Sequence, residues 1–330
     1  MPRIRTGQRK VSKTWQQTIV ERIRTGKVVP VISNSVGNNL VLGGDDRLVS
    51  DYANYIDYPL IHKDNLARMT QFISVTDEGV TDPRVIKEDY INFVKNKLFD
   101  LAELDGISAE VLAELEEEFD DVIFSEFSER LGYPQLAQGQ IDPLLILAQF
   151  PLPVYLTTGY HNFIEVALKR AGKNPRTEIC RWHSGLEGIP SVFDEPYQPS
   201  QEEPLVYHLH GVDDFPGSLV LTEDDYLEFL ITIAQNVGGG TDPIPRRVRQ
   251  ALADSSLVLL GYNLSNWDFR VLFWGLIKPR PLQQTSVSIQ LVPDEVERIF
   301  LQRYLSEFEF RIYWGDIHQY TQELRRELEG

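Results

Sequence analysis

Residues 205–229 of the chain read LVYHLHGVDDFPGSLVLTEDDYLEF, in which an apolar start leads into a polar turn. The first three residues are apolar and β-prone, which predicts a strand. His208 and His210 lie two positions apart, so an extended chain would point both side chains to one face. Gly211 then allows a sharp turn of the backbone. The stretch therefore predicts a strand that carries histidines to its carboxyl end.

A helix is predicted directly after this turn. Thr222 supplies a hydroxyl and Asp225 supplies an acid three positions later, ahead of the apolar run at 226–233. This spacing is typical of a capping box at a helix N-terminus. Open α/β sheets bind ligands where a strand ends and turns toward a helix, so we expect a functional site here. The alternative is a buried histidine pair that makes ordinary hydrogen bonds.

The composition argues against two classes of partner. The chain has 330 residues, enough for one large or two medium domains, and a net charge of -17. Such an acidic protein is not expected to bind nucleic acid or an anionic membrane, because both attract cationic surfaces. The segment 1–13 is an exception, since it is basic and has no apolar core, which predicts a flexible tail.

Cysteine content and hydropathy indicate the compartment. The single cysteine, Cys180, allows neither an internal disulfide nor a cysteine-based zinc site. We find no signal peptide and no apolar run near the about 18 residues that span a bilayer. We therefore expect a cytoplasmic protein without a metal site.

Short apolar runs alternate with helical patterns along the rest of the chain. This alternation predicts an α/β fold: a Rossmann-like, doubly wound, mostly parallel sheet of about six strands with right-handed crossovers. Pro30 lies inside the first strand and lacks an N–H, which suggests an edge position or a bulge. The expected strands are 28–32, 153–158, 205–208, 256–260, 285–292 and 308–313.

Two long segments interrupt this alternation within a single domain expected over 14–330. Residues 47–150 have helical periodicity throughout and are interpreted as a helical insertion after the first strand. Nothing in that insertion suggests catalysis. Residues 173–204 are rich in proline, glycine and acids and are interpreted as a long surface loop, a possible lid.

Four strand ends carry small or polar turns, at 33–37, 157–162, 208–211 and 261–268. In a doubly wound sheet, these turns would line one crevice. Small residues let a phosphate or ribose approach the backbone, and a helix N-terminus that follows adds partial positive charge. Together the four turns indicate a ligand of dinucleotide size.

The motifs at these turns are similar to those of a known family. VVPVISNSVG (28–37), YLTTGYHNFIEVAL (155–168), VYHLHG (206–211) and LVLLGYNLSNWDFRVL (257–272) carry the resemblance. The chain resembles, over about residues 15–325, the bacterial sirtuin-like domains that serve as anti-phage effectors and as N-terminal domains of large signalling proteins. The resemblance implies a nicotinamide dinucleotide in the crevice. In active effectors it implies hydrolysis of NAD to nicotinamide and ADP-ribose.

The resemblance also implies roles for individual residues. His210 matches the catalytic histidine, a general base on the ribose or on the attacking water. His161 stands where the family has an acid and could take over part of its polar role. The expected cofactor-binding residues are Ser33, Asn34 and Ser35 of the phosphate loop, Thr158, Gly159, Gly261, Tyr262, Asn263 and Asp268.

Two motifs differ from the family pattern. The first usually reads Gly-Ala-Gly-x-Ser, whereas residues 33–37 read Ser-Asn-Ser-Val-Gly. The second usually reads Thr-Thr-Asn-Tyr-Asp, whereas residues 157–161 read Thr-Thr-Gly-Tyr-His, so that Gly159 replaces an asparagine. A deacetylase is not expected, because the sirtuin deacetylases carry a zinc ribbon with four cysteines and this chain has only Cys180.

Three functional hypotheses follow. The chain is an NAD hydrolase, a non-catalytic sensor of NAD or ADP-ribose, or an interaction domain that uses its acidic surface. The sequence does not choose between NAD and NADP. The expected partners are the dinucleotide together with a second copy of the chain or a signalling protein.

Overall fold

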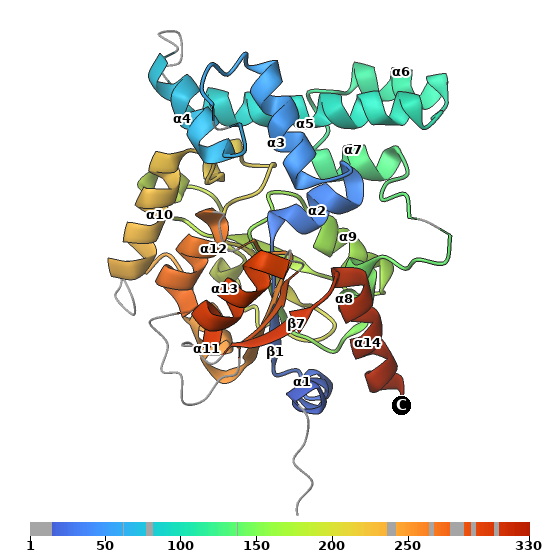
Figure 1. Ribbon diagram of the computed structural model, residues 1–330, viewed down its shortest axis with the longest axis vertical. Coiled ribbons are helices and arrows are strands. Elements are labelled where there is room, and N and C mark those ends of the chain that lie inside the picture. Colours follow the sequence, from blue (N-terminus) through green and yellow to red (C-terminus); the bar gives the residue numbers. More distant parts are fainter. Residues whose placement is uncertain are drawn as a thin grey trace, which may run out of the picture.

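The computed structural model describes residues 15–330 apart from 62, 77–81, 137, 236–241, 264–266, 278–286, 292–294 and 307–309. The basic segment 1–13 therefore lies outside the described residues. A seven-stranded sheet with the order β3-β4-β2-β1-β5-β6-β7 forms the centre, with helices on both faces (Figure 1). Every neighbouring pair is parallel, which confirms the predicted Rossmann-like α/β fold. The strands are β1 (Val28–Ile32), β2 (Val154–Thr157), β3 (Arg176–Ile179), β4 (Leu205–His208), β5 (Ser256–Leu260), β6 (Val287–Leu291) and β7 (Arg311–Trp314).

The strand β3 was not predicted. It lies inside the segment 173–204, which was expected to be a loop, and pairs with β4 at the edge of the sheet. Its sequence RTEI lacks an apolar run because the first half of this edge strand is only half-buried. Two short 3₁₀ turns, Ser184–Leu186 and Val192–Asp194, follow it.

The expected edge position of Pro30 is wrong, since β1 lies between β2 and β5 at the centre of the sheet. Ser33 donates its N–H to the Leu260 carbonyl of β5. Because successive backbone nitrogens of a strand point to opposite neighbouring strands, the nitrogen of Pro30, three residues earlier, points toward β2. Pairing with β2 begins only at Val31, opposite Leu156. The missing N–H therefore falls just before the β1–β2 ladder starts.

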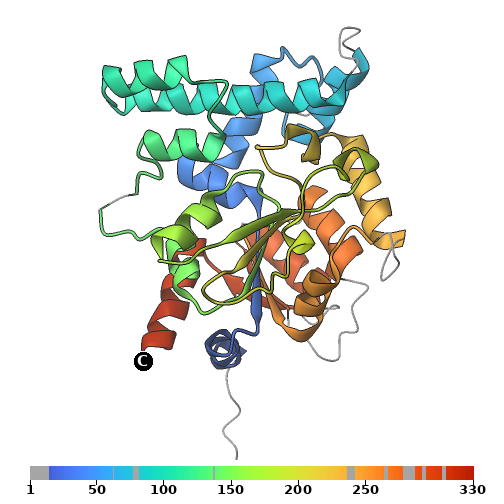
Figure 2. The same ribbon diagram turned by 180° about the vertical axis from the view of Figure 1, so that it is seen from behind.

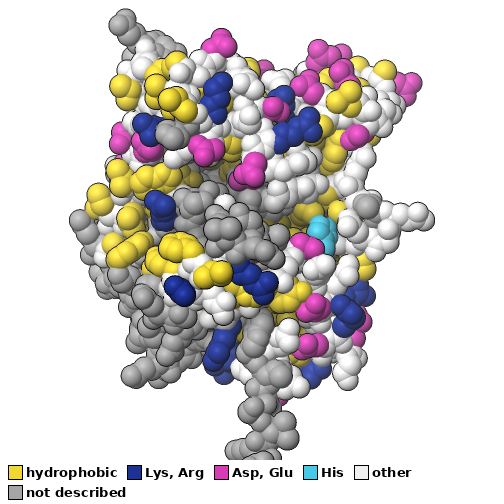
Figure 3. All heavy atoms as spheres, viewed as in Figure 1, with side chains coloured by type: hydrophobic (Ala, Val, Ile, Leu, Met, Phe, Trp, Pro, Cys, Tyr) yellow, Lys and Arg dark blue, Asp and Glu magenta, His cyan; other side chains and the backbone are white. Residues whose placement is uncertain are grey.

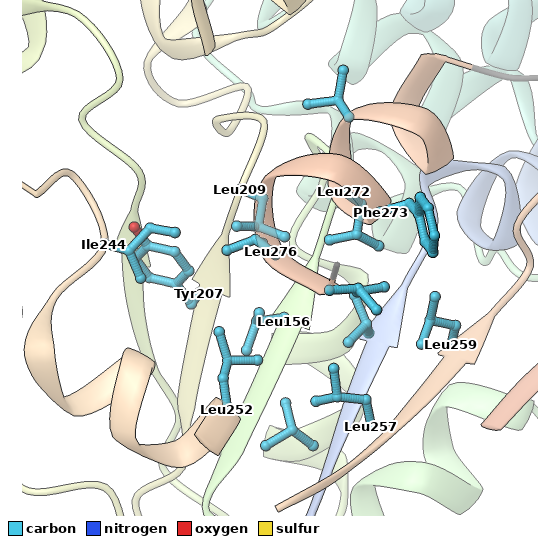
Figure 4. Packing of buried hydrophobic residues seen from close by; sticks show 14 of the residues in the cluster. Leu156, Tyr207, Leu209, Ile244, Leu252, Leu257, Leu259, Leu272, Phe273 and Leu276 are labelled. Atoms are coloured by element: carbon cyan, nitrogen blue, oxygen red, sulfur yellow. The ribbon is translucent and has the colours of Figure 1, made fainter. Parts of the chain in front are cut away.

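Two hydrophobic layers cover the sheet. One face packs against α10 (Glu223–Gln235), α11 (Arg246–Asp254), α12 (Trp267–Leu272) and the π-helical turn Phe273–Ile277. Figure 4 shows side chains of the strands facing those of α11 and the π-helical turn in this layer: Leu156, Tyr207, Leu257 and Leu259 opposite Leu252, Phe273 and Leu276. The other face packs against α1 (Trp15–Arg24), α8 (Pro143–Gln149), α9 (Phe163–Arg170) and α14 (Ile317–Glu329).

Helices between β1 and β2 form a third layer across the carboxyl ends of the strands (Figures 1 and 2). A separate core rich in aromatic side chains holds this layer together, with Tyr52, Tyr90, Phe124 and Phe127 almost fully buried. Because the chain leaves β1 at its carboxyl end, the layer is placed over the edge where ligands bind in such sheets. Its helices are α2 (Asn34–Val41), α3 (Asp45–Tyr55), α4 (Leu66–Thr76), α5 (Pro83–Leu104), α6 (Ala109–Glu117) and α7 (Phe124–Arg130).

An ion pair and hydrogen bonds attach this helical layer to the connection between β4 and α10. Asp225 and Thr222 form the predicted capping box, with backbone-to-side-chain hydrogen bonds of 3.0 and 3.1 Å. The same Asp225 pairs with Lys87 of α5 at 3.2 Å, where the side chains are only 13% and 4% exposed. Gln71 of α4 makes two more hydrogen bonds to Asp224, at 2.8 and 3.0 Å.

Substitution of Lys87 tests how much this attachment stabilises the protein. Lys87→Met leaves the buried Asp225 carboxylate without its cation and is expected to cost about 3 kcal/mol of unfolding free energy. The matched control is Lys97→Met in the same helix, whose partly exposed pair with Asp51 contributes less than about 1 kcal/mol. Urea unfolding of both variants measures the difference. Equal losses would contradict the anchoring role of Lys87.

Candidate functional site

A cleft lies between the carboxyl ends of the strands and the helical layer. Its volume is about 400 Å³, within the roughly 300–1,000 Å³ of small-molecule sites. Residues from α2, from the turns after β2 and β4, from α10 and α12, and from the helical layer line it. The cleft is therefore at the edge predicted from the four turns. Four of the residues in the sequence-based set line it, namely Asn34, Ser35, Thr158 and His210.

The turn predicted at residues 33–37 is the N-terminus of α2. Ser33 is the N-cap, and its side chain accepts a hydrogen bond from the Ser35 N–H. The Ser35 hydroxyl donates to the Gly261 carbonyl, and the Asn34 N–H donates to Thr158 Oγ1 at 3.3 Å. Serine is a preferred N-cap residue, which suits Ser33 to this position. The sequence analysis expected a turn here, and the helix was not predicted.

The start of α2 is a part of the cleft suited to an anion. Its first turn contains no acidic residue, so the partial positive charge of the helix N-terminus is uncompensated. The helices α3 and α10 also begin beside the cleft, but each has acidic residues in its own first turn. The helix α4 begins there too, with no acidic residue in its first turn and with Arg68 in the cleft lining. An anionic ligand group is therefore expected at Asn34 and Ser35.

His210 lines the cleft with a neutral imidazole. The side chain is 4% exposed and meets Tyr226 and Phe229 edge to face, with ring centroids 5.3 and 5.1 Å away. Burial lowers the pKa of His210 to about 3, so the ring is uncharged at neutral pH. A neutral imidazole in a cleft can accept a proton from a reacting group.

His208 has a different environment from His210, so the predicted common face for the two histidines is wrong. Its Nδ1 lies 2.9 Å from the Gly159 carbonyl, and its Nε2 lies 2.8 Å from Glu165 Oε1. Both partners are acceptors, so both nitrogens donate and the ring is an imidazolium. Burial disfavours this charge, but the Glu165 carboxylate outweighs burial and raises the pKa of His208. The strand β4 ends at His208 and the chain turns there, which separates the two side chains.

His161 and Gly159 lie beneath the cleft and do not line it. The His161 ring is 3% exposed and stacks on Phe163 with centroids 4.1 Å apart. Its burial lowers its pKa to about 4, so the ring is neutral at neutral pH. Gly159 donates its N–H to Thr157 Oγ1 at 2.8 Å and uses its carbonyl to accept from His208.

The turn after β5 packs against residues of α2 and of the turn after β2, and its described residues do not line the cleft itself. Gly261 has φ +74°, and a Cβ there would lie 2.3 Å from Val36, so the position needs glycine. Tyr262 is buried, and its hydroxyl lies 3.4 Å from Thr158 Oγ1. Asn263 is exposed, and Asp268 belongs to α12 with its side chain outside the described residues.

The residues of the helical layer that line the cleft were missed from the sequence. Carboxylates are spread over this layer, at the top of Figure 3. The sequence did contain a signal for these residues. An insertion that follows the carboxyl end of a central strand lies over the edge of the sheet where ligands bind. The missed residues are Asp45, Asp46, Val49, Asp64, Asn65, Leu66, Ala67, Arg68 and Tyr90, together with Tyr160, Leu219, Val220, Leu221, Tyr226 and Trp267 of the sheet domain.

The described part of the chain contains no group of three or more histidine, cysteine or acidic side chains arranged to hold a metal ion. No helix within the same residues has the length and apolar character needed to cross a membrane.

Comparison with known proteins identifies relatives of the sheet domain. Residues 153–313 match a family model described as a SIR2-like domain. An enzyme named NAD(+) hydrolase ThsA from Enterococcus faecium is 32% identical over 84 residues, which is 26% of this chain and 15% of that protein. Its namesake from Cytobacillus dafuensis is 33% identical over 84 residues, again 26% of this chain and 15% of the relative. The chain thus matches a small part of either relative.

A mutant cycle tests the packing of His161 against α2. A Cβ at Gly37 would lie 1.9 Å from His161 Nε2, so Gly37→Ala is expected to cost about 1–3 kcal/mol through overpacking. In a His161→Ala background the clash is gone, and alanine in a helix is favoured over glycine by up to about 1 kcal/mol. Urea unfolding of the four proteins measures both effects. An equal cost of Gly37→Ala in both backgrounds would refute this packing.

Proposed function

We propose that this chain, which has a SIR2-like domain and thus belongs to the sirtuin-like family indicated by its motifs, hydrolyses NAD to nicotinamide and ADP-ribose. One observation carries the proposal: a neutral His210 and the uncompensated N-terminus of α2 line the same cleft. A base and an anion site in one cleft are what hydrolysis of a dinucleotide requires.

The residues of the cleft fit NAD. The pyrophosphate would lie at the start of α2, where the helix dipole favours negative charge. Asn34 also has a buried Oδ1 that lacks a hydrogen-bond partner within the described residues, so it can accept from a ribose hydroxyl or an amide. The names of the two relatives, both NAD(+) hydrolases, support the same substrate.

His210 would act as the general base of the reaction. A water molecule attacks C1′ of the nicotinamide ribose while the bond from C1′ to the nicotinamide nitrogen breaks. His210 accepts the proton that the water loses, and the products are nicotinamide, ADP-ribose and that proton. The proposal extends to an effector role in anti-phage defence or signalling, in the cytoplasm, as an oligomer or with a signalling partner.

A second candidate is a sensor that binds NAD or ADP-ribose without turnover. The observation in its favour is Gly159, which replaces the asparagine of the family motif and directs its carbonyl to His208 instead of the cleft. His161, which replaces the acid, is also outside the cleft lining. A sensor would be stabilised by the dinucleotide and release no nicotinamide.

Replacement of His210 separates the two candidates. We expect wild-type protein to release nicotinamide from NAD, and His210→Ala to lower the rate by at least about 100-fold, the usual effect of losing a general base. His318→Gln on α14, away from the cleft, serves as the control and should keep full activity. Release is measured by chromatography, alongside the shift in melting temperature with NAD. Release that survives in His210→Ala would remove His210 from the mechanism, and a melting shift without release would favour the sensor.

The pH dependence of the reaction tests the state of His210. Because burial lowers its pKa to about 3, the free protein keeps the neutral base at every pH above that value. Protonation of His210 should therefore not reduce kcat/KM between about pH 5 and 8, since kcat/KM reports the free enzyme. Initial rates at low NAD concentration across this range measure the profile. An acidic limb near the ordinary histidine pKa, removed in His210→Ala, would show that the ring is more solvated than its burial indicates.

A further inference from the structure

Two buried tyrosine hydroxyls lie at the wall of the cleft that the helical layer forms with the turn after β2. Tyr90 of α5 is 1% exposed, and Tyr160 in the turn after β2 is 5% exposed. Their rings meet edge to face with centroids 5.9 Å apart, and both side chains line the cleft. Apart from the interaction between the two hydroxyls, neither has a hydrogen-bond partner within the described residues. Each hydroxyl therefore keeps hydrogen-bonding capacity that a ligand in the cleft can use.

A carboxylate accompanies the two hydroxyls. Asp45 lines the same wall and accepts a hydrogen bond of 2.8 Å from Asn38, which fixes its orientation. Burial raises the pKa values of Tyr90 and Tyr160, so both hydroxyls remain protonated. The subsite thus combines hydroxyl donors with a carboxylate acceptor.

The charge of the wall decides what such a subsite can accept. Asp46 and Asp64 also line the cleft, and Arg68 is the one cation among its described lining residues. A phosphate offers only acceptors and is repelled by carboxylates. A ribose diol or a carboxamide is uncharged and both donates and accepts, so it satisfies the hydroxyls and the carboxylate together.

We propose that Tyr90, Tyr160 and Asp45 form a ligand subsite for an uncharged group that both donates and accepts hydrogen bonds, either a ribose diol or a carboxamide. The proposal rests on the proposed function, because it places one part of a nicotinamide dinucleotide at this wall. The ribose alternative has a consequence for specificity. NADP carries its additional phosphate on the adenosine ribose, so a wall that holds this diol rejects the phosphate and selects NAD over NADP.

Substitution by phenylalanine removes each tyrosine hydroxyl separately and keeps the aromatic ring. Tyr90→Phe and Tyr160→Phe are expected to bind ligand about three- to tenfold more weakly, the effect of one neutral hydrogen bond. The control is Tyr58→Phe, because Tyr58 has a buried, unpaired hydroxyl in the same helical layer but does not line the cleft. Calorimetric titration with ADP-ribose and with nicotinamide separates the sources: weaker ADP-ribose binding identifies the diol, and weaker nicotinamide binding identifies the carboxamide.

The role of the Asp45 carboxylate is tested with a matched pair of variants in α3. Asp45→Asn should bring the affinity for NADP about tenfold closer to that for NAD. Asp51→Asn, in the same helix but outside the cleft lining, should leave the ratio unchanged. An unchanged ratio in Asp45→Asn overturns the assignment of this wall to the adenosine ribose.

The outcomes distinguish the subsite from the proposed function. If wild-type protein releases nicotinamide while both phenylalanine variants bind ADP-ribose and nicotinamide normally, the subsite is wrong and the proposed function stands. If a variant changes only the melting temperature of the free protein, the hydroxyl is structural and the subsite is again wrong. If wild-type protein neither binds the dinucleotide nor releases nicotinamide, both proposals fail.

Discussion

The geometry of the cleft depends on one buried ion pair, between the His208 imidazolium and Glu165. His208 is fully buried at the end of β4, and it reaches the Gly159 carbonyl and the Glu165 carboxylate at 2.9 and 2.8 Å. Thr177 of β3 donates to the same carboxylate at 2.9 Å. The pair thereby ties three neighbouring strands and α9 together. Since His210 follows two residues later, this anchor also fixes where the candidate base enters the cleft.

The helical layer provides the second wall of the site and part of its chemistry. It has its own aromatic core, yet it attaches to the sheet domain through buried polar contacts such as Lys87–Asp225. Another such contact is made by Asp213, which accepts from the Phe124 N–H of α7 at 2.8 Å. These attachments converge on the connection between β4 and α10, beside His210. Cleft shape and helical layer are therefore coupled, and the acidic residues of the layer give the cleft a charge that the sheet alone would not have.

The errors of the sequence-based interpretation have specific physical causes. Pro30 was assigned to an edge because it lacks an N–H, but the ladder to β2 begins after it. The edge strand β3 has a polar sequence, since its first half is only half-buried, and so resembled a loop. Ser33 was identified as part of a turn, whereas its N-cap role became visible only when the Ser35 N–H was seen to donate to it.

The sequence alone determined the parallel α/β fold, the capping box at Thr222, and the placement of His210, Asn34 and Ser35 at one edge of the sheet. These features depend on local periodicity and on the rule that parallel strands end on the same side. Tertiary structure decided which histidine is charged, because His208 and His210 differ in partners that are distant along the chain. It also decided that Asp45, Tyr90 and Tyr160 meet at one wall, since that juxtaposition depends on packing between segments that no local pattern encodes.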